Sequence, residues 1–164
     1  MLGTFSAWRL GTLQVRALPF ARELRRRGAR VAIVTVPWDA PSEAGVLDCI
    51  DGVPVLNTRT VGPRKALAAS AEQAAWVRHL RPRLVHVFKP KGFGALTTRL
   101  IPRHIPIVVD SDDWEGDGGW NQAGGYGLLQ RRAFTWQERT LLASAQAVTA
   151  ASTLLEERAR RVRA

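Results

Sequence analysis

The chain has 164 residues, 46% of them hydrophobic and 23% charged, so it is long enough for one domain with a real core and too apolar for a disordered chain. Its formal net charge is +10, from 24 Lys and Arg against 14 Asp and Glu. The basic clusters are not interleaved with aromatics, which disfavours a nucleic-acid partner and leaves contact with an anionic membrane surface open.

Two further features of the composition bear on where the protein works. No apolar run approaches the roughly 18 residues of a membrane span, and Arg9 and Arg16 interrupt the N-terminal segment too early for a secretory signal. We therefore expect a cytoplasmic protein, with peripheral association to the inner face of the membrane left open. The lone Cys49 excludes an internal disulfide and offers no metal-ligand spacing.

Strand and helix patterns alternate along the first two thirds of the chain. The expected strands lie at 1–5, 30–35, 53–56, 84–88 and 105–109. The expected helices lie at 12–27, 64–80 and 92–101. In the first helix, Leu13, Leu18, Ala21 and Leu24 form one apolar stripe, and Gly28 ends it. Residues 37–52 are expected to form an irregular loop, because Pro, Asp and Gly recur there.

The last third of the chain continues the alternation. Six glycines from 116 to 127 predict a mobile connection. A long helix at 128–144 follows, with Trp136 expected in the core, and then a sixth strand at 145–150. Thr153 and Glu156 have the spacing of a capping box at the start of a final helix. Six strands with crossovers predict an α/β fold with a doubly wound parallel sheet, Rossmann-like.

The segment 108–117, VVDSDDWEGD, gathers five of the fourteen acidic residues at the end of an apolar strand. Open parallel sheets bind ligands in the crevice outside the carboxyl ends of their strands. Because five neighbouring carboxylates repel one another, we expect a cation, a hydroxyl-rich ligand or nearby arginines to share the site. The segment therefore predicts a polar binding site.

Several segments taken in order carry a family resemblance. A short strand and glycine turn precede LRRRG at 24–28 and RVAIVT at 30–35, and RPRLVH at 81–86, ERTLLASAQAV at 138–148 and Ala151-Ser152 follow. These segments resemble the N-terminal, acceptor-side domain of GT-B fold glycosyltransferases, family 4. The resemblance covers essentially the whole chain and half of such an enzyme. We therefore expect 1–164 to be a single Rossmann-like acceptor-binding domain, truncated at both ends, with the C-terminal donor-binding domain missing.

The resemblance implies a hexosyltransferase-type reaction. A sugar would move from a nucleotide-sugar donor to the hydroxyl of a sugar or lipid-linked acceptor, with retention of the anomeric configuration. This domain would hold the acceptor and carry no cofactor of its own, because the nucleotide-sugar is the donor substrate. Without the partner domain, the fragment is expected to be inactive.

The loop 6–11 and the helix after it are the first candidate site. Backbone N–H groups and a positive helix terminus there suit a diphosphate, which makes Ser6, Gly11 and Thr12 candidate phosphate-binding residues. Alternatively, Gly11 only permits a tight turn. The loop lacks the Gly-x-Gly-x-x-Gly fingerprint, which disfavours a nicotinamide cofactor.

The acidic segment supplies the candidate catalytic residues Asp110, Asp112 and Asp113. Carboxylates accept strong hydrogen bonds from sugar hydroxyls, and one of the three could polarise the attacking hydroxyl. Trp114 and Glu115 are candidate substrate-binding neighbours. Two structural interpretations compete: an acidic turn that caps a following helix, and salt bridges to Arg131 or Arg132.

The fourth expected strand departs from the family pattern His-x-His, which reads His86-Val87-Phe88 here. His86 is a candidate donor-sugar contact or a hydrogen-bonded core histidine. Since an aromatic replaces the second histidine, the family's usual catalytic assignment is not carried over. Lys89 and Lys91 are candidates for contacting phosphate or acceptor instead.

Two other function classes remain open. One is a hydrolase or phosphotransferase with Mg²⁺ on Asp110 and Asp112, although the spacing is wrong for a calcium loop. The other is a non-catalytic carbohydrate- or partner-binding module, in which Trp114, Trp120 and Tyr126 stack on a sugar or cover it as a lid. The favoured interpretation includes no metal and no nucleic acid.

Overall fold

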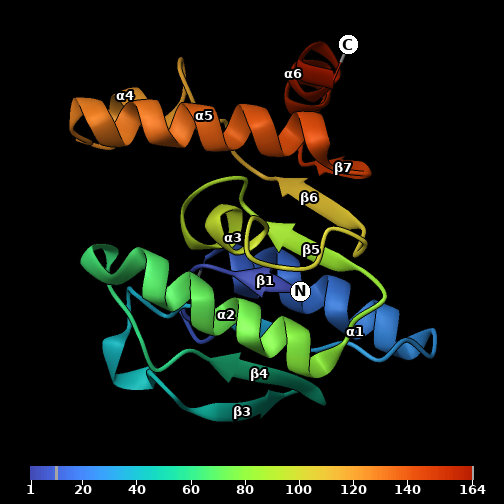
Figure 1. Ribbon diagram of the computed structural model, residues 1–164. Coiled ribbons are helices and arrows are strands. Elements are labelled where there is room, and N and C mark those ends of the chain that lie inside the picture. The colour runs from blue at the N-terminus through green and yellow to red at the C-terminus, as the bar shows by residue number, and fades with distance from the viewer. Residues whose placement is uncertain (10, 164) are drawn as a thin grey trace.

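The computed structural model describes residues 1–9 and 11–163. One sheet of seven strands runs through the molecule in the order β3-β4-β2-β1-β5-β6-β7 (Figure 1), and every neighbouring pair is parallel except β3 and β4. The strands are β1 (Leu2–Gly3), β2 (Ile33–Thr35), β3 (Leu47–Ile50), β4 (Val53–Asn57), β5 (Val85–Phe88), β6 (Ile107–Ser111) and β7 (Ala147–Ala150).

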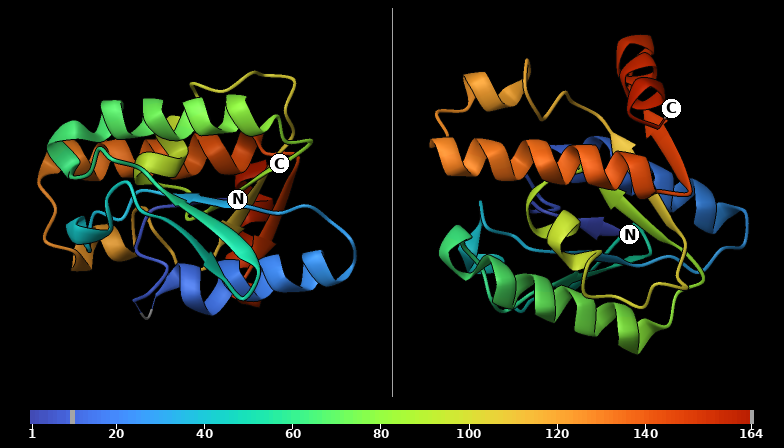
Figure 2. Two further views of the ribbon diagram at one scale, coloured as in Figure 1. Left: turned by 90° about the horizontal axis from the view of Figure 1, so that it is seen from below. Right: turned by 45° about the horizontal axis from the view of Figure 1, so that its top comes forward.

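Helices cover both faces of the sheet. They are α1 (Leu18–Arg26), α2 (Ala66–Leu80), α3 (Gly92–Thr97), α4 (Trp120–Ala123), α5 (Leu128–Ser144) and α6 (Thr153–Arg163), with a π turn η1 (Leu13–Ala17) and 3-10 turns η2 (Pro41–Glu43) and η3 (Pro63–Lys65). Figure 2 shows α2 and α5 on one side of the sheet and α1 on the other. None of the described helices combines the length and apolarity needed to cross a bilayer.

Each face of the sheet has its own core. On the α1 face, Leu13, Leu18 and Ala21 pack against apolar side chains of the sheet, including Phe88. The opposite core gathers side chains of α2, α3 and α5 around β5 and β6. Of the predicted stripe on the first helix, Leu24 is the exception, because 38% of it is exposed.

The strand order identifies where a ligand would bind. Leaving out β3, the six parallel strands have the order 3-2-1-4-5-6, which is that of the dinucleotide-binding α/β sheet. The chain reverses its direction of winding between β1 and β5, and in such sheets ligands bind outside the carboxyl ends of the two strands at this point. The predicted α/β, Rossmann-like sheet is confirmed.

The extra strand β3 corrects the expected loop at 37–52. It pairs with β4 through a two-residue turn in which Asp51 and Gly52 have φ of 49° and 78°. Two left-handed residues in succession make the turn type that follows the right-handed twist of a hairpin, and Asp-Gly is a favoured pair there. The sequence therefore contained a hairpin signal that the prediction missed.

Several boundaries also differ from the prediction. Helix α3 ends at Thr97, and β6 continues to Ser111, so Asp110 belongs to the strand. The connection 116–127, expected to be mobile, contains the short helix α4, whose Asn121 is buried and donates to Arg131 O and Thr135 Oγ1.

Two side-chain predictions in the last third were wrong. Trp136 is not in the core: 54% of it is exposed and its ring stacks on Arg99. The cap of α6 comes from Ser152, whose Oγ accepts from Leu155 N–H at 3.3 Å, whereas Glu156 pairs with Arg160. The predicted loop 6–11 and the end of the chain include Leu10 and Ala164, which lie outside the described residues.

Candidate functional site

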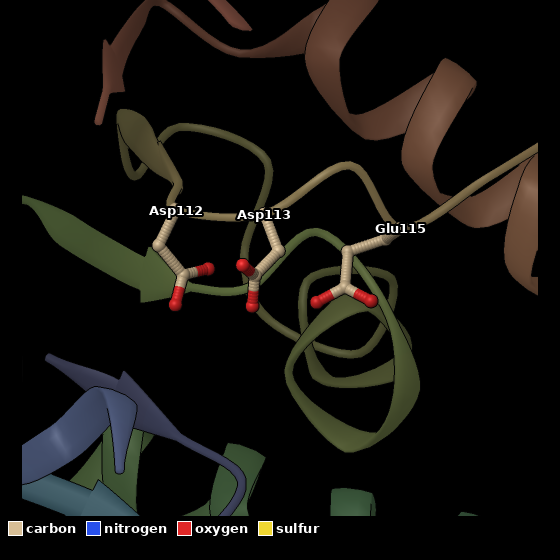
Figure 3. Close-up of side chains that lie close together, drawn as sticks. All are labelled: Asp112, Asp113 and Glu115. Atoms are coloured by element: carbon tan, nitrogen blue, oxygen red, sulfur yellow. The ribbon is translucent and has the colours of Figure 1, made fainter. Parts of the chain in front are cut away.

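The acidic segment lies at the carboxyl edge of the sheet, where β6 ends. In Figure 3 the carboxylates of Asp112, Asp113 and Glu115 point the same way, toward the end of β5. Their oxygens lie within 4.8 Å of one another. The predicted gathering of acidic side chains at this edge is therefore present in the structure.

One ammonium group contacts all three carboxylates of this cluster. Lys89, the first residue after β5, places Nζ 2.5 Å from Asp113 Oδ2, 2.9 Å from Glu115 Oε1 and 3.4 Å from Asp112 Oδ2. Lys91 Nζ contacts the other oxygen of Glu115. We call Lys89, Lys91, Asp112, Asp113 and Glu115 the lysine–carboxylate cluster.

Backbone strain accompanies the central lysine. Lys89 has φ of 74°, a left-handed conformation that is unfavourable for a side chain other than glycine. Such conformations persist only where surrounding contacts determine them, and they occur preferentially at functional sites. Here the three carboxylates fix the side chain, while Lys89 N–H donates to Asp110 O at 3.3 Å.

The pKa values of Asp112 and Asp113 are shifted in opposite directions. Burial alone would lower the pKa of Lys89, but the charges of Glu115 and Asp112 and the hydrogen bonds to Asp113 and Glu115 raise it above its ordinary value. Burial raises the pKa of Asp112 despite the charge of Lys89. For Asp113 burial acts upward too, but the hydrogen bond and charge of Lys89 outweigh it and the pKa lies below the ordinary value. Asp112 is therefore the stronger base.

The two aspartates also differ in what they can reach. Asp113 has 41% of its side chain exposed. Asp112 is only 9% exposed; its Oδ2 accepts from Thr12 Oγ1 at 2.7 Å, and its buried Oδ1 has no hydrogen-bond partner. An unpaired buried carboxylate oxygen is costly, so it marks a position where a ligand hydroxyl would be stabilised.

Asp110 is not part of this cluster. It is fully buried and holds Arg16 through two hydrogen bonds, of 2.6 Å to Nε and 2.7 Å to Nη2, and Thr149 Oγ1 also donates to it. The structure thus gives the predicted catalytic Asp110 a fully paired position that joins β6 to η1 and β7. It also weighs against Mg²⁺ held by Asp110 and Asp112, since the guanidinium occupies both oxygens of Asp110.

The start of the first helix makes these contacts through an irregular turn. Leu18 N–H donates to Leu13 O, five residues back, which is the hydrogen bond of a π-helix. In this stretch Thr12 reaches Asp112 and Arg16 reaches Asp110. Thr12, a predicted phosphate contact, therefore positions a candidate catalytic carboxylate.

His86 has the features of the core alternative. It is 7% exposed, its ring lies 4.4 Å from that of Phe88, and Thr149 Oγ1 lies 3.5 Å from Nε2. Burial lowers its pKa to about 4, and the charge of Arg16 adds to this while Asp110 opposes it. A buried neutral histidine on the α1 face supports the Asp110 network.

The loop after β1 also uses its polar groups within the protein. Ser6 N–H donates to Asp39 Oδ1 at 2.8 Å, and Ser6 Oγ donates to Glu43, 2.7 Å from both of its carboxylate oxygens. A phosphate would have to displace two carboxylates here, so the surroundings of Ser6 weigh against its predicted phosphate role. Gly11 N–H makes no hydrogen bond among the described contacts, and Gly11 O accepts from Val15 N–H.

A second buried ion pair supports the acidic segment from behind. Glu138, on α5, accepts from Glu115 N–H at 3.1 Å and pairs with Arg158, on α6, at 2.6 Å. Burial raises the pKa of Glu138, against the charge of Arg158. The Arg158 guanidinium lies 4.7 Å from the ring centre of Trp114, so Trp114 is packed against α6.

The salt-bridge alternative named the wrong partners for the acids. Within the described residues the salt bridges of the acidic segment run to Arg16, Lys89 and Lys91, and none runs to Arg131 or Arg132. Arg131 instead donates to Tyr126 O. Lys91 lies 5.3 Å from the Tyr126 ring centre, which brings the Gly-rich segment against the cluster, and Trp120 is half exposed beside Asp113.

Sequence reasoning missed Arg16 and Glu138. The only available signal for Arg16 was its spacing four residues after Thr12, one helical turn away. For Glu138 there was none, because its contacts depend on how α5 and α6 meet.

A family model described as "Glycosyl transferase 4-like domain" matches residues 11–164. Among curated proteins, no match was found.

Proposed function

Because this chain belongs to the glycosyl transferase 4-like domain family, we propose that it is the acceptor-side domain of a retaining glycosyltransferase that moves a sugar from a nucleotide-sugar to an acceptor hydroxyl. The donor nucleotide would be bound by a second, C-terminal domain. The observation that carries the proposal is the lysine–carboxylate cluster at the carboxyl edge of β5 and β6.

In this proposal Asp112 and Asp113 have different roles toward the acceptor. Asp113 is exposed and ionised, so it accepts hydrogen bonds from hydroxyl groups and orients the acceptor. Asp112 has a raised pKa and one free oxygen, which suit it to polarise the attacking hydroxyl. Thr12 and Lys89 hold Asp112 in place.

The proposed reaction is a substitution at the anomeric carbon of the donor. The acceptor oxygen forms a bond to that carbon on the face from which the donor phosphate oxygen leaves, and the bond to the phosphate oxygen breaks, so the configuration is retained. The hydroxyl proton, drawn toward Asp112, leaves finally with the nucleoside diphosphate. Lys89 stays charged, because its pKa is raised, and it keeps the carboxylates close together in spite of their mutual repulsion.

The test uses the complete polypeptide that the gene encodes. It is incubated with a panel of nucleotide-sugars and glycan or glycolipid acceptors, and the nucleoside diphosphate and the product are measured, with the anomeric configuration read by NMR. Asp112→Asn should lower kcat by about 10² or more, as expected for loss of acid–base assistance. Asp113→Asn should mainly raise KM for the acceptor.

Asp117→Asn is the matched control, because Asp117 is exposed and accepts only from Thr135 Oγ1 among the described contacts. Equal losses in the Asp112 and Asp117 variants would contradict the proposal. Glycan binding without transfer by the complete polypeptide would favour the binding-module alternative, and metal-dependent phosphate release would favour the hydrolase.

A further inference from the structure

The amino edge of the sheet, opposite the site, carries an exposed basic surface. Between Glu72 and Asp110 the sequence contains no acidic residue. Five exposed arginines and three exposed leucines of this stretch lie at the ends of α2 and α3 and at the entries to β5 and β6. We call this set the arginine–leucine face: Arg78, Arg81, Arg83, Arg99, Arg103, Leu80, Leu84 and Leu100.

The hydrogen bonds show that these segments are contiguous. Arg78 Nη1 donates to Leu100 O at 3.1 Å, which joins α2 to the turn after α3. Val85 N–H donates to Pro106 O at 2.9 Å, so β5 and β6 begin side by side. In Figure 1 these ends lie at the right, away from the arrowheads of β5 and β6.

The positive charge of this face is not neutralised within the domain. Among residues 1–9 and 11–163, no acidic side chain forms an ion pair with any of the five arginines. The contacts they make are with neutral groups: Arg78 with a carbonyl, and Arg99 with Thr140 Oγ1 and the Trp136 ring. The face therefore keeps its attraction for anions.

The leucines indicate which kind of anion fits. Leu80, Leu84 and Leu100 are 43%, 47% and 42% exposed between the arginines. The phosphates of a nucleic acid would pair with the arginines, but a nucleic acid offers the exposed leucines no apolar surroundings. An anionic bilayer surface interacts favourably with both kinds of side chain. The arginines pair with the lipid phosphates, while the apolar side chains enter the boundary between headgroups and acyl chains. The half-exposed Trp136 indole beside Arg99 also suits this boundary.

We propose that the arginine–leucine face binds the surface of a bilayer containing anionic phospholipids. The lysine–carboxylate cluster lies at the opposite edge of the sheet, so membrane contact and acceptor binding use separate residues. The two proposals therefore succeed or fail independently.

The experiment measures co-sedimentation of the full chain with phosphatidylcholine vesicles, with and without phosphatidylglycerol. We expect binding only with phosphatidylglycerol, weakened by salt. Each basic side chain near such a surface contributes about a fivefold factor, so Arg81→Glu, Arg83→Glu and Arg103→Glu together should weaken partitioning by about 100-fold or more. Leu80→Ser with Leu84→Ser should reduce the binding that persists at high salt.

The matched control reverses three exposed charges at the other edge, by Arg59→Glu, Arg64→Glu and Lys65→Glu, and should lose far less. Circular dichroism establishes that each variant is folded. The proposal is overturned if phosphatidylglycerol does not increase co-sedimentation of the full chain with vesicles, or if both triple variants lose binding equally. It is also overturned if the chain binds RNA tightly and does not bind vesicles.

Discussion

The two edges of the sheet treat charge in opposite ways. At the carboxyl edge, Asp110, Asp112 and Glu115 are buried or nearly so, and Arg16, Lys89 and Lys91 pair with them at short distances. At the amino edge the arginines are exposed and their few ion pairs lie in solvent, such as Arg22 with Asp51, which are 45% and 62% exposed. Buried pairs fix a geometry, whereas exposed charges create a field around the molecule.

The largest expected difference in the free energy of unfolding is between two variants, each of which breaks one ion pair at one edge of the sheet. Arg16→Met leaves the fully buried Asp110 with Thr149 as its remaining side-chain donor, and it should cost about 3 kcal/mol or more of the free energy of unfolding. Arg22→Met removes an exposed pair and should cost less than about 1 kcal/mol. Urea unfolding of both variants measures the contrast, and similar losses would show that the two edges do not differ.

The next effect depends on pH and concerns His86, which faces Asp110 and Thr149 and lies near Arg16. Because its folded pKa of about 4 lies below the ordinary 6.5, protonation favours the unfolded chain. The stability it contributes is complete above pH 6.5 and is lost as the pH falls toward 4, by about 3 kcal/mol in total.

Urea unfolding at a series of pH values, compared between wild type and His86→Gln, isolates this contribution. The variant should lose most of the slope between pH 6.5 and 4. His104→Gln, at the amino edge and exposed, should keep the wild-type slope. An unchanged slope in the His86 variant would mean that the histidine is not buried in solution.

The smallest of the three effects concerns the support behind the cluster. A Cβ on Gly116 would overlap Glu138 Oε2 and lie 3.2 Å from Arg158 Nη2. Gly116→Ala should therefore destabilise by about 1–3 kcal/mol, through overpacking at a buried ion pair. Gly127→Ala has no atom within 4 Å of the added carbon and should cost less, about 0.5 kcal/mol, because alanine is a poorer N-cap of α5 than glycine. Thermal unfolding compares the two, and equal shifts would contradict the close packing at Gly116.

The fold could be predicted from sequence because its signals are local. Apolar runs, glycine stops and helix periodicity mark six of the seven strands and the long helices, and β6 (Ile107–Ser111) puts the acids at the carboxyl edge. The hairpin at Asp51-Gly52 was missed because an exposed edge strand such as β3 lacks the apolar run of a buried one.

The sequence predicted the position of the acidic side chains in the fold, but not the residues with which they form ion pairs. Asp112 and Asp113 lie where the sequence put them, but their partner Lys89 follows β5, and the partner of Asp110 is Arg16, 94 residues away in the chain. Such pairings depend on strand order and helix docking, which one sequence does not encode locally. Asp110 and Asp112 look alike in sequence, but both oxygens of Asp110 are paired whereas Asp112 Oδ1 has no partner, which separates a structural carboxylate from a candidate catalytic one.

Because of the π turn at Leu13–Ala17, the contacts of Thr12 and Arg16 depend on the number of residues between them. Each residue turns an α-helix by about 100°, so deleting one here to restore regular winding would swing Thr12 away from Asp112 while Arg16 stayed in place, or the reverse. This helix therefore tolerates substitution on its exposed face more readily than any change of length. Insertions and deletions in related chains should accordingly fall after Arg26, in the turn at Gly28, rather than between Thr12 and Leu18.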